Sequence, residues 1–241
     1  MPLSIWPAVP APGRCPASPG QTLCPQRLDT TAAAMITTAF TAPGDLVVVI
    51  PGPGTSALLA AARAGRRALA LAASPRHNRD LAALLDNGLD PAVRPLARVR
   101  PGGPAAFLDG SCREAGQAAL AITAACATPG CPPPGGDADP RTDPGVLYAA
   151  CQRALRPGGL LAVITAAARQ PGWPGQVIAH ARAAGLIYAQ HIIALHAPIR
   201  GSRLHPPDPG APALPQLAAA MAGRHLPAHS DLLVFAAPGH D

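Results

Sequence analysis

A run of apolar, mostly β-branched residues followed by a glycine-rich turn constrains the fold more than any other feature of the chain. Residues 46–50 read Leu-Val-Val-Val-Ile, the next four are Pro51-Gly52-Pro53-Gly54, and residues 55–64 are rich in Ala and Leu. An unbroken apolar run of this length is typical of a strand buried on both faces of a sheet. The sequence therefore predicts a strand, a tight turn and a helix in direct succession.

Short apolar runs and helical patterns continue to alternate along the chain, which is typical of β-α-β units around a parallel sheet. Beyond the first unit, strands are expected at residues 68–71, 96–100, 118–123, 160–165, 187–195 and 231–235. Helices are expected at residues 29–40, 75–85, 143–155 and 176–184. Asp143 is expected to cap the third of these helices, with Pro144 at its first position.

The domain organisation follows from length and from the distribution of proline. The chain has 241 residues, a size at which one α/β domain is the default expectation. Residues 1–28 are rich in Pro and show no sustained period, so they are interpreted as an extended N-terminal arm with no packed element. Residues 29–241 are interpreted as the single domain, with a Pro- and Gly-rich loop at residues 127–143.

The formal net charge of +6 comes mainly from arginine, which suits phosphate contacts. This charge permits a nucleic-acid partner such as DNA, although a solvated basic surface explains it equally well. Six cysteines without CxxC spacing favour neither zinc nor a disulfide framework, so reduced thiols in a cytoplasmic protein are expected, with no metal site. No apolar stretch approaches the roughly 20 residues of a membrane span, so a membrane partner is excluded.

The glycine turn is the strongest local signal for a ligand. Gly52 and Gly54 allow a positive φ and a close backbone approach, and Thr55 starts the helix, so a nucleotide moiety could sit over this turn. The alternative is a plain strand-to-helix turn. A nucleotide site normally has a carboxylate at the end of the next strand, for the ribose hydroxyls. That strand ends without an acid at Ala72, so the site is incomplete.

Several stretches are similar, in order and spacing, to amino-group DNA methyltransferases. The stretches that carry the resemblance are Pro43-Gly44-Asp45-Leu46-Val47, the Gly52 and Gly54 turn, Ala64-Gly65-Arg66-Arg67-Ala68, Ser74-Pro75-Arg76, and the helix and turn from Tyr148 through Arg156-Pro157-Gly158-Gly159 to Leu161. The resemblance implies an α/β Rossmann-like class I methyltransferase fold, with a mostly parallel seven-stranded sheet and an antiparallel last strand. It also implies S-adenosylmethionine as the cofactor and DNA as the substrate.

The chain differs from this family at the residues that carry out the methyl transfer. At the end of the fourth strand the family has Asp, Asn or Ser, two prolines and an aromatic, whereas this chain has Ala124, Ala125, Cys126 and Ala127. Methylation of a base amine needs the base flipped out, stacked on a ring and held by oxygen acceptors. The alanine side chains supply none of these. No catalytic residue is therefore assigned.

Other candidate residues have an ordinary structural explanation. Tyr148 and Trp173 could replace the missing stacking ring, but packing of a helix and cover of a surface explain them better. His191 and His196 lie in an apolar strand and are interpreted as structural. His229 could pair with Asp231 nearby in sequence, and a simple loop contact is the alternative.

Three hypotheses about function remain. The first is a DNA methyltransferase-like protein, transferring methyl groups to a base amine, with weak or lost activity. The second is an inactive methyltransferase-fold protein, a pseudoenzyme that serves as a binding module. The third is a small-molecule methyltransferase, which could do without the base-holding motif but would still need an acid for the ribose.

Overall fold

The computed structural model describes the segments that make up the folded body of the chain. The described residues are 3–7, 9, 24, 28–50, 54–72, 74–125, 143–166, 172–196, 199–200, 203–204 and 229–239. The strands are β1 (Leu3–Trp6), β2 (Leu46–Val49), β3 (Arg67–Ala72), β4 (Ala97–Pro101), β5 (Ala118–Ala125), β6 (Leu155–Ala166), β7 (Ile187–Leu195), β8 (Ile199–Arg200), β9 (Arg203–Leu204) and β10 (His229–Ala236). The helices are α1 (Thr30–Phe40), α2 (Gly54–Arg63), α3 (Pro75–Gly88), a 3-10 turn (Arg94–Leu96), α4 (Ala105–Leu108), α5 (Pro144–Ala154) and α6 (Trp173–Ala183).

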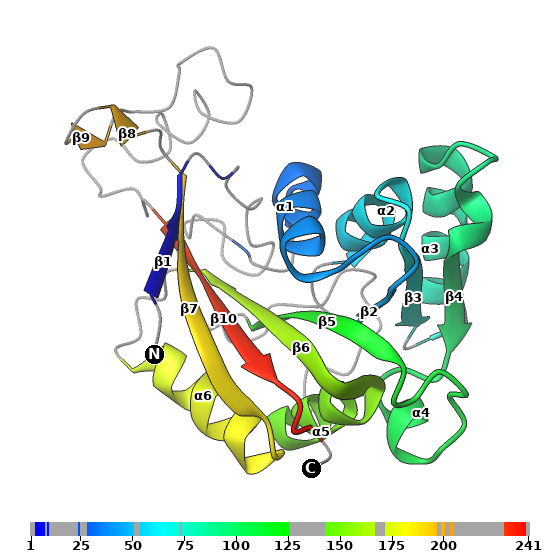
Figure 1. Cartoon of the computed structure of the whole chain (residues 1–241). Coiled ribbons are helices and arrows are strands. Elements are labelled where there is room, and N and C mark those ends of the chain that lie inside the picture. Colours follow the sequence, from blue (N-terminus) through cyan, green and yellow to red (C-terminus); the bar gives the residue numbers. More distant parts are fainter. Residues whose placement is uncertain are drawn as a thin grey trace.

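One large twisted sheet organises these elements (Figure 1). Its strand order is β1-β7-β10-β6-β5-β2-β3-β4, and β8 pairs with β9 in a separate small ribbon. All neighbouring strands of the large sheet are parallel except at β10, which is antiparallel to both β6 and β7. The expected α/β Rossmann-like methyltransferase fold, with its mostly parallel sheet and antiparallel last strand, is confirmed. The large sheet has eight strands rather than the expected seven.

The additional strand is β1, from a segment in which no packed element was expected, and that expectation is wrong for these residues. β1 pairs in parallel with β7, and Trp6 stacks on Phe40 of α1 with ring centroids 6.1 Å apart. Val9 follows it, is buried, and donates its N–H to the Leu195 carbonyl over 2.8 Å. β1 has only four residues and lies between prolines, so its sequence is too short to show the alternation of a strand. It forms as a strand because it makes backbone hydrogen bonds with β7. The boundary between residues 28 and 29 stays a prediction.

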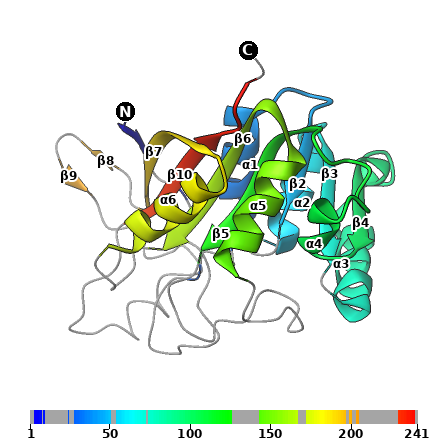
Figure 2. The same ribbon diagram turned by 90° about the horizontal axis from the view of Figure 1, so that it is seen from below.

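Helices cover both faces of the sheet (Figures 1 and 2). Val47 and Val49 of β2 pack with α1, α2 and α3, whereas Val48 between them packs with the cluster of α4, α5 and α6. This alternation is the ordinary pleat of a strand, in which successive side chains point to opposite faces. Because both faces are covered, a central strand can be apolar at every position.

The predicted helices are present, with shifted ends. Asp143 caps α5 as expected, accepting the Gly145 N–H over 2.8 Å, and Asp29 caps α1 by accepting the Thr31 N–H over 2.7 Å. Helix α6 begins at Trp173 rather than at residue 176, because Pro174 is at its start. Within the described part of the chain, no helix is both long enough and apolar enough to cross a membrane.

Much of the sequence that carried the family resemblance lies at the amino edge of the parallel strands. Arg66, just before β3, is almost fully buried and donates to Thr41 Oγ1 (3.1 Å), to the Thr41 carbonyl (2.7 Å) and to the Ala64 carbonyl. Arg156, near the start of β6, forms an ion pair with Asp45, just before β2, over 3.2 Å. These residues hold loops together on the side opposite to the glycine turn. Their role in this structure is that of a scaffold.

The Arg156-Pro157-Gly158-Gly159 turn needs glycine at two positions for two different reasons. Gly158 has φ +71°, a conformation that side chains disfavour. Gly159 has an ordinary φ, but a Cβ there would lie 2.7 Å from the Ala118 carbonyl oxygen of β5. The Gly159 carbonyl also accepts the Ala237 N–H over 2.8 Å, so the turn joins β5, β6 and the residue after β10.

We expect Gly159→Ala to lower the free energy of unfolding by about 1–3 kcal/mol, because the added methyl group must displace backbone atoms. Gly175→Ala is the matched control, since nothing lies within 4 Å of its Cβ position on α6. That change is expected to be neutral or to stabilise by roughly 0.5 kcal/mol. Urea denaturation followed by circular dichroism measures both. Equal stability of Gly159→Ala and the wild type would contradict the close approach.

Candidate functional site

The carboxyl ends of the parallel strands and the amino end of β10 meet at one edge of the large sheet, where open α/β sheets bind their ligands. Gly54 is the first residue of α2, with φ +60°, and both it and Thr55 are partly exposed there. The free N–H groups of the first turn of α2 are therefore at this edge. Gly52 lies outside the described residues. The assignment of Gly52, Gly54 and Thr55 to cofactor binding stays a prediction.

The end of β3 has no acidic side chain, and its polar contacts are made by backbone groups. Ala72 is fully buried, and its carbonyl accepts the N–H groups of Gly102 (3.1 Å) and Gly103 (3.2 Å) after β4. Gly103 is itself buried. Among the described residues at the carboxyl ends of β2, β3, β4 and β5 there is no Asp or Glu. The first turn of α2 thus presents N–H groups that suit an anion, and the end of β3 has no carboxylate of the kind expected for a ribose.

The end of β5 offers no polar side chain either. Ala124 is buried and Ala125 half-buried, beside Ile164 and Thr165 of β6 in the sheet register. The structure thus places both alanines at the end of the fourth predicted strand, as expected. Cys126 and Ala127 lie outside the described residues. Neither Ala124 nor Ala125 supplies a side-chain acceptor for a base amine.

The aromatic residues considered as substitutes lie on the helical layer of α5 and α6. Tyr148 is buried in the apolar cluster between α5 and the sheet, and this burial raises the pKa of its phenol. Trp173 packs against the same cluster. The prediction that Tyr148 packs its helix is confirmed.

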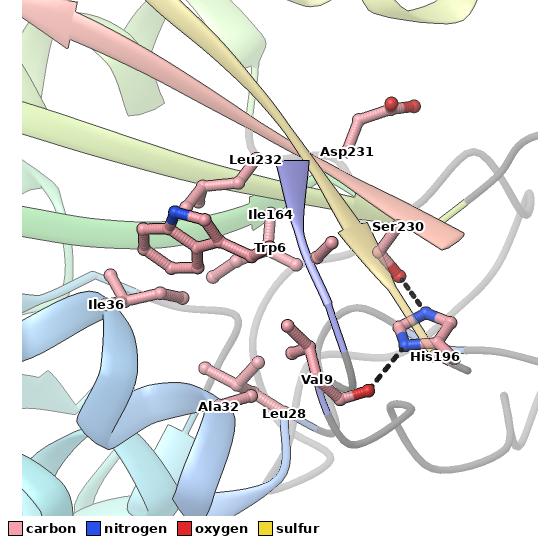
Figure 3. A pocket seen from close by; sticks show the side chains of 11 residues that line it. Trp6, Val9, Leu28, Ala32, Ile36, Ile164, His196, Ser230, Asp231 and Leu232 are labelled. Atoms are coloured by element: carbon pink, nitrogen blue, oxygen red, sulfur yellow. Dashed lines mark hydrogen bonds between the residues drawn. The ribbon is translucent and has the colours of Figure 1, made fainter. Parts of the chain in front are cut away.

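A pocket on the other face of the sheet was not predicted from the sequence (Figure 3). It is a small, open hollow, in which the space available to a water-sized sphere is about 20 Å³. It is lined by Trp6, Val9, Leu28, Ala32, Ile36, Ile164, Ala194, His196, Ser230, Asp231 and Leu232. These residues come from β1 and the stretch after it, α1, and the ends of β6, β7 and β10 at the edge that also carries the glycine turn. No single stretch of sequence contains enough of them to form a recognisable motif.

A hydrogen-bonded chain crosses one wall of this pocket (Figure 3). His196 Nδ1 lies 3.0 Å from the Val9 carbonyl oxygen, and His196 Nε2 lies 2.9 Å from Ser230 Oγ. A carbonyl oxygen can only accept, so Nδ1 carries the proton when the imidazole is neutral. Nε2 then accepts the hydrogen bond that the Ser230 hydroxyl donates. His196 is therefore fixed in one tautomer and one orientation.

The surroundings of His196 favour its neutral form. Burial lowers the pKa of its imidazole, and His229 nearby acts in the same direction, while the hydrogen bond to Val9 opposes both. The interpretation of His196 as purely structural missed this pocket. Ser230 is 34 residues away in sequence, and only the pairing of Ser230 with Ala194 in the sheet brings the two side chains together.

A second polar pair is formed by Asp231 and His191. His191 Nε2 lies 2.9 Å from Asp231 Oδ1, and His229 Nε2 lies 3.9 Å from the same oxygen. Asp231 thus contacts both histidines, and the closer partner is the one distant in sequence. Within the segments that the structure describes, no group of three or more His, Cys, Asp or Glu residues could hold a metal ion.

Comparisons with proteins of known structure identify the fold of this chain. No family model and no curated protein matches the sequence. A geranyl diphosphate methyltransferase, solved in complex with S-adenosylmethionine, is 16% identical with a TM-score of 0.52, over 96% of this chain and 97% of that chain. The 4+2 cyclase SpnF is 18% identical with a TM-score of 0.52, over 89% and 85%. A protein described as a sarcosine dimethylglycine methyltransferase from Galdieria sulphuraria is 14% identical with a TM-score of 0.51, over 87% and 84%.

At these identities the comparisons show the fold alone, which is the class I methyltransferase fold. One of the three proteins carries the name of a cyclase, which illustrates that this scaffold does not fix a reaction. The function has to be argued from the edge of the sheet and the pocket beside it.

We expect the free energy of unfolding to fall as the pH drops below about 6.5, the ordinary pKa of histidine, with a contribution from His196. Its pKa is lowered in the folded protein, so the unfolded chain binds more protons in this window and is favoured there. Urea denaturation between pH 5 and pH 8 measures the slope. His196→Gln, which cannot titrate, should show a shallower slope over the same range. Identical slopes for both proteins would contradict the buried, neutral imidazole.

Proposed function

We propose that this chain is an S-adenosylmethionine-dependent methyltransferase that acts on a small molecule. The observation that carries the proposal is the apolar pocket beside His196, which opens at the same sheet edge as the glycine turn and α2. Ligand pockets of small-molecule enzymes are concave and mainly apolar, and this small hollow shares its apolar lining with them. The methyltransferase fold supports the reaction class.

The proposed cofactor would be held mainly by backbone. Gly54, Thr55 and the free N–H groups of the first turn of α2 would bind its carboxylate, since helix N-termini favour anions. Ala72 stands at the position expected for the ribose-binding carboxylate and has no acceptor side chain, so we expect weak binding. When bound, S-adenosylmethionine supplies a methyl group on a positively charged sulfur.

DNA methylation, the reaction implied by the sequence resemblance, has less support. The described end of β5 has only Ala124 and Ala125 where a base would need acceptors and a stacking ring. Several arginines are also engaged within the protein: Arg66 with backbone carbonyls, Arg156 with Asp45, and Arg100 with Glu114 over 3.0 Å. A small molecule requires none of the missing base-holding groups.

A binding module without catalysis is the second candidate, and Ala72 is the observation that favours it. Without a carboxylate for the ribose hydroxyls, the fold could persist while the cofactor no longer binds. The two candidates differ in one measurable property, the affinity for S-adenosylmethionine.

We expect isothermal titration calorimetry to detect weak binding of S-adenosylmethionine to the wild type. Ala72→Asp should tighten it by about tenfold or more, since a carboxylate accepting hydrogen bonds contributes roughly 1.5–3 kcal/mol. Ala72→Asn is the matched control of similar size without charge, and a thermal melt of each variant checks its folding. Gly54→Asp, which places a negative charge at the N-terminus of α2 in the expected anion site, should abolish binding.

Absence of heat for the wild type and for folded Ala72→Asp at millimolar S-adenosylmethionine would refute the proposed function and leave the binding module. If binding is found, methyl transfer from labelled cofactor to small hydroxyl compounds, compared with transfer to DNA, separates the two methyltransferase hypotheses.

A further inference from the structure

We propose that β1 and Val9 form a strap that closes over the apolar hollow beside His196, and that protonation of His196 releases this strap. The strap consists of Leu3–Trp6 together with Val9, which follows β1 in the chain. Its use as a gate for the methyl acceptor rests on the proposed function, whereas the release itself does not.

β1 is attached to the large sheet along one side only. It is the last strand of the sheet and forms backbone hydrogen bonds with β7 alone. Leu3 and Ile5 are 60% and 54% exposed, so no helix covers that face of β1. β4, at the other edge of the sheet, packs against α3. Edge elements with few buried side chains open at a lower free energy than the core, so the strap can open while the rest of the sheet stays folded.

The inner face of the strap closes the hollow (Figure 3). Trp6 stacks on Phe40 of α1 and lines the hollow, and Val9 is buried and lines it as well. Ile36 of α1 and Leu232 of β10 belong to the same lining. Release of the strap would therefore join the small hollow to the space that Trp6 and Val9 occupy. Under the proposed function, this wider apolar site would receive the methyl acceptor.

A histidine ties the strap to the end of β7. The Val9 N–H donates to the Leu195 carbonyl over 2.8 Å, and the Val9 carbonyl oxygen lies 3.0 Å from His196 Nδ1. His196 Nε2 lies 2.9 Å from Ser230 Oγ. A neutral imidazole with its proton on Nδ1 donates to Val9 and accepts from Ser230, which satisfies both of its nitrogens. The closed strap thus fits the neutral form of His196.

The charged groups of β10 do not compensate a positive charge on His196. Asp231 follows Ser230, but its carboxylate points away from His196 and lies 2.9 Å from His191 Nε2 (Figure 3). His229 precedes Ser230 and adds a positive charge when it is protonated, which disfavours a second charge on His196. A protonated His196 under the closed strap would therefore lack an anionic partner from this strand.

The other described elements around the hollow supply no counter-charge either. The lining residues of the strap, of α1 and of β6 are apolar, and so is Ala194 of β7. Asp29, the N-cap of α1, is engaged with the Thr31 N–H over 2.7 Å. Burial lowers the pKa of His196, and His229 acts in the same direction, against the bond to Val9. Burial of an uncompensated charge is costly, so the closed strap disfavours the cation.

Acid therefore shifts the strap toward its open state. In the closed state the pKa of His196 lies below the ordinary value of about 6.5, whereas release hydrates the imidazole and brings its pKa back toward that value. Below this pH the open state binds more protons than the closed state. By linkage, the ratio of open to closed molecules rises by up to about tenfold per pH unit.

Hydrogen exchange of single amides in the full chain, followed by NMR between pH 5 and 7.5, tests the release. The Val9 N–H reports on the strap, and the amide of Val48 in β2 reports on the core of the sheet. At each pH, Val9 is expected to exchange at a lower free energy than Val48, because the strap opens without global unfolding. The protection factor of Val9 should fall by up to about tenfold per pH unit below 6.5.

Two variants identify the titrating group. His196→Gln cannot titrate and is expected to remove most of the pH dependence of the Val9 protection factor. His191→Gln is the matched control, since His191 lies on the same strand but contacts Asp231. This change should leave the pH dependence of Val9 as it is in the wild type.

The fluorescence of Trp6 gives a second measurement that needs no change at His196. The chain has two tryptophans, so a Trp173→Phe background leaves Trp6 as the only indole. Lowering the pH from 7.5 to 5 should shift its emission to the red and increase its quenching by acrylamide. The far-ultraviolet circular dichroism should stay that of the folded protein, because only the strap opens.

Three results would overturn the inference: equal free energies of exchange for Val9 and Val48, a Val9 protection factor that does not depend on pH, or the same pH dependence in folded His196→Gln. If His196→Gln does not fold, the wild-type exchange and the quenching of Trp6 decide, and no change of either in acid refutes the strap. Acid release without any heat from S-adenosylmethionine would refute the proposed function and leave the strap standing.

Discussion

The structure depends on central strands that are buried on both faces. β2 and β5 are covered by helices above and below, so their hydrophobic burial holds both helical layers to one sheet. Many of the buried residues are Ala, which keeps the layers close and makes backbone contacts such as Gly159 against Ala118 sensitive to a single methyl group. Two layers joined in this way leave only the sheet edges for chemistry.

The two edges of the sheet have different characters. At the amino edge, the buried Arg66 contacts backbone carbonyls of a neighbouring loop, and the exposed Arg156 pairs with the half-buried Asp45. At the carboxyl edge, Ala72 and Ala124 provide only backbone. Side chains at the amino edge thus support the class I methyltransferase fold, while the carboxyl edge offers a ligand mainly backbone groups, including the first turn of α2.

The central units were predictable because their signals are local. The run at residues 46–50 and the cap at Asp143 each depend on a few neighbouring residues, and the structure has them as expected. β1 and the pocket were not predictable in the same way. His196 and Ser230 meet only through the pairing of β7 with β10, and Val9 reaches them only because β1 pairs with β7. Long-range pairing leaves no periodic trace in the sequence.

The position of β10 has a consequence for the order of assembly. β10 lies between β6 and β7, two strands that precede it in the chain and have no direct pairing with each other. Until residues 229–236 are available, β6 and β7 each expose a strand edge, and β7 with β1 is not joined to the rest of the sheet. The half of the molecule from β5 to β4 can fold while the chain is still being synthesised. The half that contains the pocket cannot complete its sheet until the last strand has been synthesised. The unpaired strand edges in this half are therefore available for aggregation for the longest time.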